Sequence, residues 1–285
     1  MTSIKFCKFH GFGNDYIVIE RDKIPSDAGL ADLVRAMCHR HTGAGSDGIT
    51  VIEKLGEDDG ADYFCEIVNP DGSIASFSGN GTRCAAAYLY YKKLWLDPGL
   101  LLRTRSGVKN YDLIERISDG HYWFEAEIGK PKFASGEVPV KTAERMESVI
   151  DHTITVAGKN YLISCVNVGN PVACIFVDEF DPDWRTIGQA AEAHEAFPEK
   201  ANIVFVKVID QENIELRIWE RGAGETAASG TCASGAAVLS SFTGRTGRTV
   251  SVFSEGGTTE IHWRDDDEIL ITGRADLAYC GEWPV

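Results

Sequence analysis

The sequence lacks the features that mark several large classes of protein. No apolar run approaches the ~18 residues of a membrane span, and the N-terminus has no apolar core of signal-peptide length. We therefore expect a cytoplasmic protein that does not bind membranes. No cluster of lysine or arginine interrupts a net charge of −15, which would repel phosphate backbones, so nucleic acid is not expected as a partner.

Signs of covalent cross-linking and of common cofactors are also missing. The eight cysteines include no Cys-x-x-Cys pair, and the histidines show no metal-ligand spacing. In a chain of 285 residues, which is too large to need covalent staples, this predicts reduced thiols, with neither disulfides nor a metal site. The patterns GxGxxG, GxxxxGK[ST] and HExxH are absent, and no cofactor is expected.

What the sequence does contain is a pair of similar stretches. Residues 78–80 (Ser-Gly-Asn) precede a small-residue helix, and residues 229–231 (Ser-Gly-Thr) precede another. Upstream of these, Asn14 and Asn170 each lie in a glycine turn that enters an apolar strand. Similar lengths of chain separate each asparagine from its serine. The pattern predicts a duplicated domain.

Each half is expected to be a mostly β sheet curled around one apolar helix, which is an α+β fold. Apolar periodicity predicts strands at residues 4–9, 16–20, 49–53, 63–68, 101–105, 111–117, 122–128, 152–156, 161–166, 173–177, 203–208, 214–219, 248–253, 258–263 and 269–272. It predicts further helices at 27–39 and 184–196. We expect an N-terminal half at 1–128, completed by the tail 274–285, and a C-terminal half at 129–273.

The two helix starts are candidate anion sites. A loop that closes on a helix start leaves backbone N–H groups without partners at the positive end of the helix dipole. We expect those of Gly79, Asn80, Gly230 and Thr231 to hold the carboxylate of a small ligand in a cleft between the halves. Two like groups on opposite sides of one carbon, here Ser78 and Ser229, would suit inversion of a stereocentre.

Several stretches, in this order and spacing, resemble the diaminopimelate epimerase family: KFHGFGNDYIVIE, GAGSDGI, NPDGSIASFSGNGTRC, VNVGNP, PEKANIVFV and WERGAGETAASGTCASGAA. The resemblance implies an isomerase of two pseudo-symmetric domains that works without pyridoxal phosphate. Its reaction converts LL- to meso-diaminopimelate, a precursor of lysine and peptidoglycan. Carried over by position, the residues implied to contact this amino acid are Asn14, Asn69, Asn170, Asn202, Glu220 and Arg221. Arg221 would reach the distal carboxylate.

The sequence departs from the family at its two catalytic positions. Serine stands at 78 and 229 where the family has cysteine bases, and an alcohol needs an adjacent base to become reactive. Val172 replaces a family histidine, and Cys232 and Gly48 replace other family residues. A Cys→Ser substitution introduced on purpose to trap an enzyme would not need these additional changes, so they favour natural divergence. Either the serines act in a modified mechanism, or Glu220 or Cys232 takes over, or racemisation is lost.

Other functions and plainer roles stay open. The chain could be a lyase that removes one proton and then a β-substituent, or an amino-acid-binding homologue without catalysis. Either serine could simply cap its helix, and Asn14 and Asn170 could simply shape turns. His10 and Asp47 are expected to make structural hydrogen bonds, and Cys84 is expected to pack in the core. A homodimer is considered, but the sequence does not fix the oligomeric state.

Overall fold

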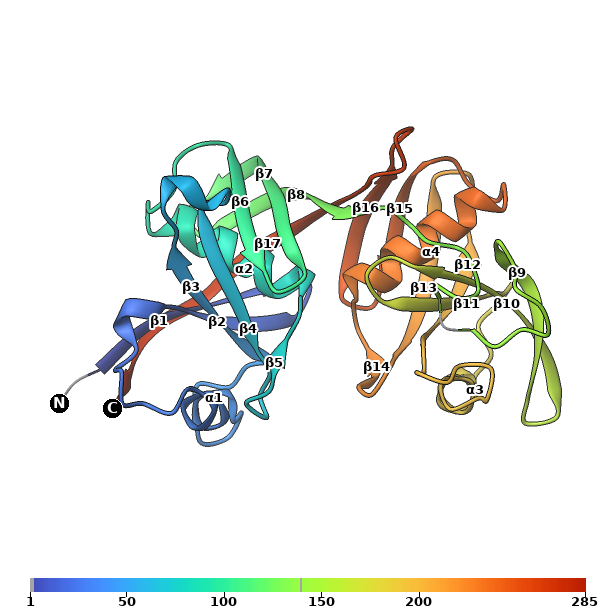
Figure 1. Ribbon diagram of the computed structural model, residues 1–285, viewed down its shortest axis with the longest axis horizontal. Helices are drawn as coiled ribbons and strands as arrows, with labels where there is room; N and C mark the ends of the chain where they lie inside the picture. Colours follow the sequence, from blue (N-terminus) through green and yellow to red (C-terminus); the bar gives the residue numbers. More distant parts are fainter. Residues whose placement is uncertain (1–2, 139) are drawn as a thin grey trace. The chain divides into compact units, whose positions relative to one another are not determined.

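The chain folds into two compact units. The computed structural model describes residues 3–138 and 140–285 (Figure 1). Unit 1 comprises Met1–Ala126 and Thr272–Val285, and unit 2 comprises Glu127–Ile271. Both crossings between the units lie two residues before the boundaries expected from the sequence. The predicted α+β class is confirmed by the mixture of strands and helices in each unit.

Unit 1 is built around two helices and a sheet. Its elements are β1 (Ser3–Gly11), β2 (Asn14–Glu20), the 3-10 turn η1 (Arg21–Lys23), α1 (Leu30–Cys38), β3 (Gly48–Lys54), the 3-10 turn η2 (Glu57–Asp59), β4 (Tyr63–Val68), β5 (Ile74–Ala75), α2 (Gly79–Tyr91), β6 (Gly99–Thr104), β7 (Gly107–Ser118) and β8 (His121–Gly129). The end of β8 passes into unit 2.

Unit 2 contains a matching set of elements. They are β9 (Val149–Val156), β10 (Lys159–Asn167), β11 (Pro171–Phe176), α3 (Trp184–Glu192), β12 (Asn202–Val208), β13 (Asn213–Glu220), β14 (Gly224–Thr226), α4 (Gly230–Phe242), β15 (Thr249–Ser254), β16 (Gly257–Trp263) and β17 (Ile269–Pro284). Most of β17 lies in unit 1, where it pairs with β1.

The two units repeat one order of strand pairings. In unit 1, β2 and β3 are parallel, β3 and β4 antiparallel, and β4 and β6 parallel. In unit 2 the same relations join β11 to β12, β12 to β13, and β13 to β15. The registers place Tyr16 opposite Gly48 and Val172 opposite Asn202. This repeat confirms the predicted duplication and makes Tyr16 and Val172 equivalent positions.

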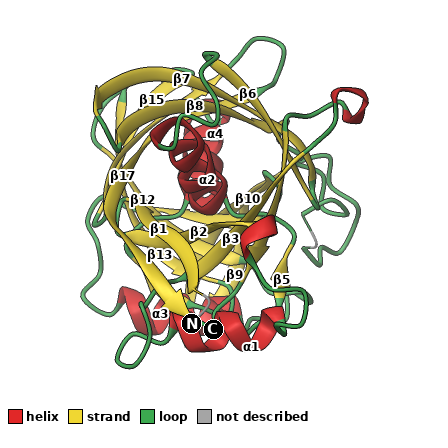
Figure 2. Ribbon diagram, turned by 90° about the vertical axis from the view of Figure 1, so that its left-hand side faces the viewer, coloured by secondary structure: helices red, strands yellow, loops and turns green. Residues whose placement is uncertain are grey.

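Each unit encloses one helix that is buried on all sides. Figure 2 shows α2 surrounded by curved strands, and it packs against β1, β2, β3 and β4. Residues 84–87 of α2 (Cys-Ala-Ala-Ala) are wholly buried, as expected for a helix without a polar face. Small side chains let the strands approach the helix closely. No helix in the described ranges is long and apolar enough to cross a membrane.

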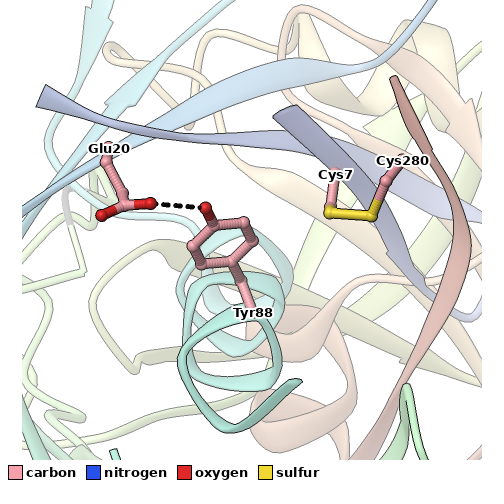
Figure 3. Close-up of a disulfide and its surroundings, with 4 residues drawn as sticks. All are labelled: Cys7, Glu20, Tyr88 and Cys280. Atoms are coloured by element: carbon pink, nitrogen blue, oxygen red, sulfur yellow. Dashed lines mark hydrogen bonds between the residues drawn. A yellow bond between two sulfur atoms is a disulfide. The ribbon is translucent and has the colours of Figure 1, made fainter. Parts of the chain in front are cut away.

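One prediction about the cysteines is wrong. Cys7 and Cys280 form a disulfide, drawn in Figure 3, although the chain was expected to contain none. The two residues lie directly opposite one another in the antiparallel pair of β1 and β17, with their Cα atoms 4.0 Å apart. They are 273 residues apart in sequence, so their spacing gave no sign of this pairing. The other six cysteines are free and buried.

The last strand also differs from expectation. The predicted strand at 269–272 is the start of β17, which continues to Pro284. Its second half pairs with β1, from Asp276 opposite His10 to Pro284 opposite Ser3. Exposed polar residues and two glycines interrupt its apolar pattern, which is why periodicity alone did not reveal its length.

Candidate active site

The two serines occupy equivalent helix starts. Ser78 is the N-cap residue of α2 and Ser229 that of α4, with φ of −143° and −147° and ψ of 118° and 121°. Glycine follows each serine, and the first N–H groups of each helix have no acceptor within the helix. Each unit therefore offers a positive helix end next to a hydroxyl group.

Ser78 is held by hydrogen bonds to neutral groups. Its Oγ donates to the hydroxyl of Tyr16 at 2.9 Å and accepts from the Gly81 N–H at 3.1 Å. The ring of Tyr16 lies over Gly81, where an added Cβ would come within 3.1 Å of Cε1 of that ring. A larger residue at 81 would push the ring away, so Gly81 allows Tyr16 to reach Ser78.

Ser229 has different neighbours. Its side chain makes no capping hydrogen bond to any described residue. Its hydroxyl lies near the Glu220 carboxyl and the Cys232 thiol, and it influences the pKa of both groups. Burial raises the pKa of Glu220, and the nearby Ser229 hydroxyl partly offsets that rise. A hydroxyl beside such a carboxylate has the adjacent base that an alcohol requires.

Cys232 does not fit the role of a substitute catalytic thiol. Its side chain is wholly buried. Burial raises the pKa of the thiol well above its ordinary value, and the nearby Glu220 carboxylate adds to the rise. The reactive form of cysteine is the thiolate, so Cys232 would carry little of it at neutral pH. Of the two groups expected to replace the family cysteines, Glu220 is the better supported.

Two of the asparagines expected to contact substrate meet in unit 1. Nδ2 of Asn80 donates to Oδ1 of Asn14 at 3.0 Å, and Nδ2 of Asn14 donates to Oδ2 of Asp47 at 2.8 Å. Asn69 is not part of this series of hydrogen bonds: its Nδ2 donates to Oγ of Ser73 in the turn between β4 and β5. We call Asn14, Asn69, Ser78, Gly79 and Asn80 the first half-site.

In unit 2, Asn202 and Arg221 are joined. Oδ1 of Asn202 accepts from the Arg221 N–H at 2.9 Å, and NH1 of Arg221 donates to the carbonyl of Glu199 at 3.0 Å. Asn170 lies in the turn before β11, two residues before Val172, which pairs with Asn202. We call the following residues the second half-site: Asn170, Asn202, Glu220, Arg221, Ser229, Gly230 and Thr231.

The turn after β13 is fastened by a carboxylate that the sequence did not single out. Oε1 of Glu192, a buried residue at the end of α3, accepts from the Gly222 N–H at 3.0 Å. Its other oxygen accepts from the Trp219 indole N–H at 2.9 Å. Glu192 thus contacts residues on both sides of Glu220 and Arg221, the two charged members of the second half-site.

Sequence reasoning missed Tyr16 and Arg83 as well. Tyr16 lies two residues after Asn14 in a strand, so the alternation of strand side chains places both on one face. Arg83 is an isolated charge in a small-residue helix, three residues after Asn80. Asp47 makes the hydrogen bonds that were expected of it, and His10 accepts from the Gly13 N–H at 3.4 Å. The described residues contain no group of three or more histidine, cysteine or acidic side chains able to hold a metal ion.

Comparison with known proteins decides the family. The family model for diaminopimelate epimerase matches residues 6–133 and 164–278. The chain belongs to the diaminopimelate epimerase family. It is 37% identical over 281 residues to the diaminopimelate epimerase of Caldanaerobacter subterraneus, covering 98% of this chain and 99% of that one. It is 35% identical to that of Pelotomaculum thermopropionicum, covering 98% of each. The predicted family and enzyme class, an isomerase, are confirmed.

Solved structures share the fold at low sequence identity. A hydroxyproline epimerase from Agrobacterium vitis superposes with a TM-score of 0.67 at 15% identity, covering 99% of this chain and 92% of that one. A phenazine biosynthesis protein of the PhzF family from Bacillus anthracis gives 0.68 at 14% identity, with both chains fully covered. These two proteins therefore share the fold of this chain.

Proposed function

We propose that this protein is a cofactor-independent amino-acid epimerase in which Ser78 and Ser229 carry the two proton transfers at the α-carbon. Its substrate is diaminopimelate or a similar amino acid with a second carboxylate, which Arg221 would bind. The substrate is inferred from the relatives' names and the match of the binding residues. Ser78 and Ser229 stand at the positions of the family's two bases.

The observation that carries this proposal is the pair of equivalent helix starts, each with a serine as its N-cap residue, together with the Glu220 carboxyl that lies near Ser229. In one direction, the Cα proton passes to Oγ of Ser229 as the hydroxyl proton of Ser229 passes to Glu220. In the second transfer, Ser78 donates its hydroxyl proton to the carbanion. The Tyr16 hydroxyl, which accepts a hydrogen bond from Ser78 in the structure, then rotates to return a proton to it. Glu220 ends with one proton more and Tyr16 with one fewer, and exchange with water restores both.

The helix starts would stabilise the charge that develops during proton transfer. Removal of the Cα proton places negative charge on the substrate carboxylate as an enediolate. The N–H groups of residues 79–80 and 230–231 would donate to its oxygens, at the positive ends of two helix dipoles. The same groups bind the ground-state carboxylate, so catalysis depends on stronger hydrogen bonds in the transition state.

Proton exchange in heavy water tests this function. The protein is incubated with LL-diaminopimelate in D2O, and deuterium at Cα is measured together with the ratio of LL to meso forms. We expect deuterium to enter the product of inversion. Absence of deuterium from Cα across a broad panel of amino acids, diaminopimelate included, contradicts the proposal.

A second candidate function is amino-acid binding without catalysis. It is favoured by the position of Ser78, whose hydroxyl already caps α2 and donates to Tyr16. Calorimetry that shows diaminopimelate binding, with no deuterium exchange in the experiment above, would identify this function.

A further inference from the structure

Two residues of the first half-site, Asn14 and Asn80, lie in a series of hydrogen bonds that runs from a guanidinium group to a carboxylate. NH1 of Arg83 donates to Oδ1 of Asn80 at 3.0 Å. The series continues through Asn14 to Oδ2 of Asp47. A guanidinium group can only donate hydrogen bonds, and a carboxylate can only accept them.

This polarity determines how both asparagine amides are turned. An amide can be flipped to exchange its oxygen and NH2 group, and both orientations fill nearly the same space. If Asn80 flipped, its NH2 would face the guanidinium of Arg83. If Asn14 flipped, its oxygen would face the carboxylate of Asp47. Each flip would place like groups together, so the two ends of the series hold both amides in one orientation.

Arg83 is unusual because its charge is buried without a carboxylate partner. Only 2% of the residue is exposed, and no described acidic side chain lies within ion-pair distance of it. Its Nε has no hydrogen-bond partner among the described residues. NH1 also approaches the Arg274 carbonyl at 3.5 Å. The Phe12 ring, 5.9 Å from the guanidinium carbon, adds a cation–π contact. A buried charge without a carboxylate partner is costly for stability, which directs attention to what its hydrogen bonds do.

We propose that Arg83 and Asp47 are positioning residues that fix the amide orientations of Asn14 and Asn80 for substrate binding. This proposal rests on the function proposed above. Each amide uses one NH2 hydrogen and one oxygen lone pair within the series, which leaves one of each free for a ligand. The positive charge of Arg83, in the second turn of α2, adds to the potential that attracts a substrate carboxylate.

The proposal has a direct test in the behaviour of the side-chain amides. In the ¹⁵N–¹H NMR spectrum of the wild-type protein, the NH2 hydrogens of Asn14 and Asn80 should exchange slowly with water. Arg83→Met and Asp47→Asn should each make this exchange faster for both residues. Unchanged exchange in both variants overturns the proposal, whatever the substrate proves to be.

Binding of meso-diaminopimelate, measured by calorimetry, provides the functional readout. Arg83→Met and Asp47→Asn should each weaken binding about ten- to a hundredfold, the loss expected for hydrogen bonds to charged groups. Arg83→Lys, which keeps a cationic donor, should recover part of the affinity. Arg40→Met is the matched control: it removes the half-exposed ion pairs to Asp47 and Asp15 but leaves both carboxylates, and should cost less than about fivefold.

A double-mutant comparison separates positioning from general destabilisation. If Asp47 acts through Asn14, then Asp47→Asn should cause no further loss of binding in an Asn14→Ala background. Additive losses overturn the proposal. If the wild-type protein does not bind diaminopimelate at all, the proposed function fails, and the NMR result still decides whether the amides are held.

Discussion

Ser78 and Ser229 occupy equivalent helix starts, yet their surroundings differ. In unit 1, Tyr16 crosses Gly81 to reach Ser78, and every hydrogen bond of that serine is to a neutral group. In unit 2 the position of Tyr16 is taken by Val172, and the titratable groups beside Ser229 are the Glu220 carboxyl and the Cys232 thiol. The difference indicates that one serine has a neutral hydroxyl as its partner and the other has a carboxyl that can act as a base.

The packing around the two helices differs between the units. Counted from the serines, Gly81 corresponds to Cys232. In unit 1 the ring of Tyr16 lies over Gly81, whereas in unit 2 Val172 is tightly packed, because a Cβ added at Gly235 would lie 2.9 Å from its Cβ. If Val172 and Cys232 fill the space that Tyr16 and Gly81 fill in unit 1, changes at these two positions should be coupled.

Placing cysteine at the two positions where the family resemblance implies it should have the largest effect on the comparison. Ser78→Cys with Ser229→Cys replaces two weak acids by thiols that a helix start can ionise. We expect Cα deuterium exchange with diaminopimelate to rise roughly 10²–10⁴-fold, the usual contribution of acid–base groups. Ser240→Cys, at the other end of α4, is the control and should change nothing. No gain in the double variant would show that the pocket has changed as well as the bases.

The pH dependence of exchange should reveal the base in unit 2. Glu220 must be ionised to accept a proton, and burial raises its pKa above the usual value for glutamate. Exchange by the wild-type protein should therefore rise about tenfold per pH unit below that pKa and level off above it. The rate profile is compared with that of Glu220→Gln, which should lack this rise. The same rise in both proteins would mean that another group titrates.

The packing residues of unit 1 should be tolerated at the equivalent positions of unit 2 only when both are introduced together. Val172→Tyr alone should lower the free energy of unfolding by about 1–3 kcal/mol, because the space over α4 is filled. Adding Cys232→Gly should relieve part of this strain, so that the double variant is more stable than the sum of the single effects. Urea unfolding of all three variants measures the coupling. Strict additivity would show that Val172 and Cys232 do not share that space.

The smallest expected effect concerns the turn that carries Glu220. Burial alone would raise the pKa of Glu192, but hydrogen bonds from Trp219, Gly222 and Lys200 outweigh it and leave the pKa lowered. The carboxylate therefore adds stability above its unfolded-state pKa, and this is lost as the pH falls through the folded-state pKa. Glu192→Gln should cost about 1–2 kcal/mol at neutral pH and nothing in acid. Urea unfolding of both proteins from neutral to acidic pH checks whether the difference in their stability disappears in acid.

The fold was predictable because its signals are local or repeated. Apolar runs marked most strands, and matched Ser-Gly helix starts marked the duplication. The disulfide and the length of β17 depend on pairing between the two ends of the chain, which no local pattern encodes. A one-residue shift in that register would have separated Cys7 from Cys280.

The candidate site was predictable in its members but not in its connections. The family motifs named Asn14, Asn80, Glu220 and Ser229. The sequence could not show that Tyr16 contacts Ser78, because that contact spans 62 residues and depends on the absence of a side chain at position 81. The sequence also did not reveal that Arg83 donates a hydrogen bond to Asn80, since a lone arginine in a helix is usually exposed.

The most direct test compares the supporting groups of the two serines. Cα deuterium exchange with LL-diaminopimelate is measured for Glu220→Gln and Tyr16→Phe under identical conditions. If unit 2 supplies the base and unit 1 a neutral donor, Glu220→Gln should lose about 10²–10⁴-fold and Tyr16→Phe less than about tenfold. Equal losses in the two variants, or a larger loss in Tyr16→Phe, would contradict the account.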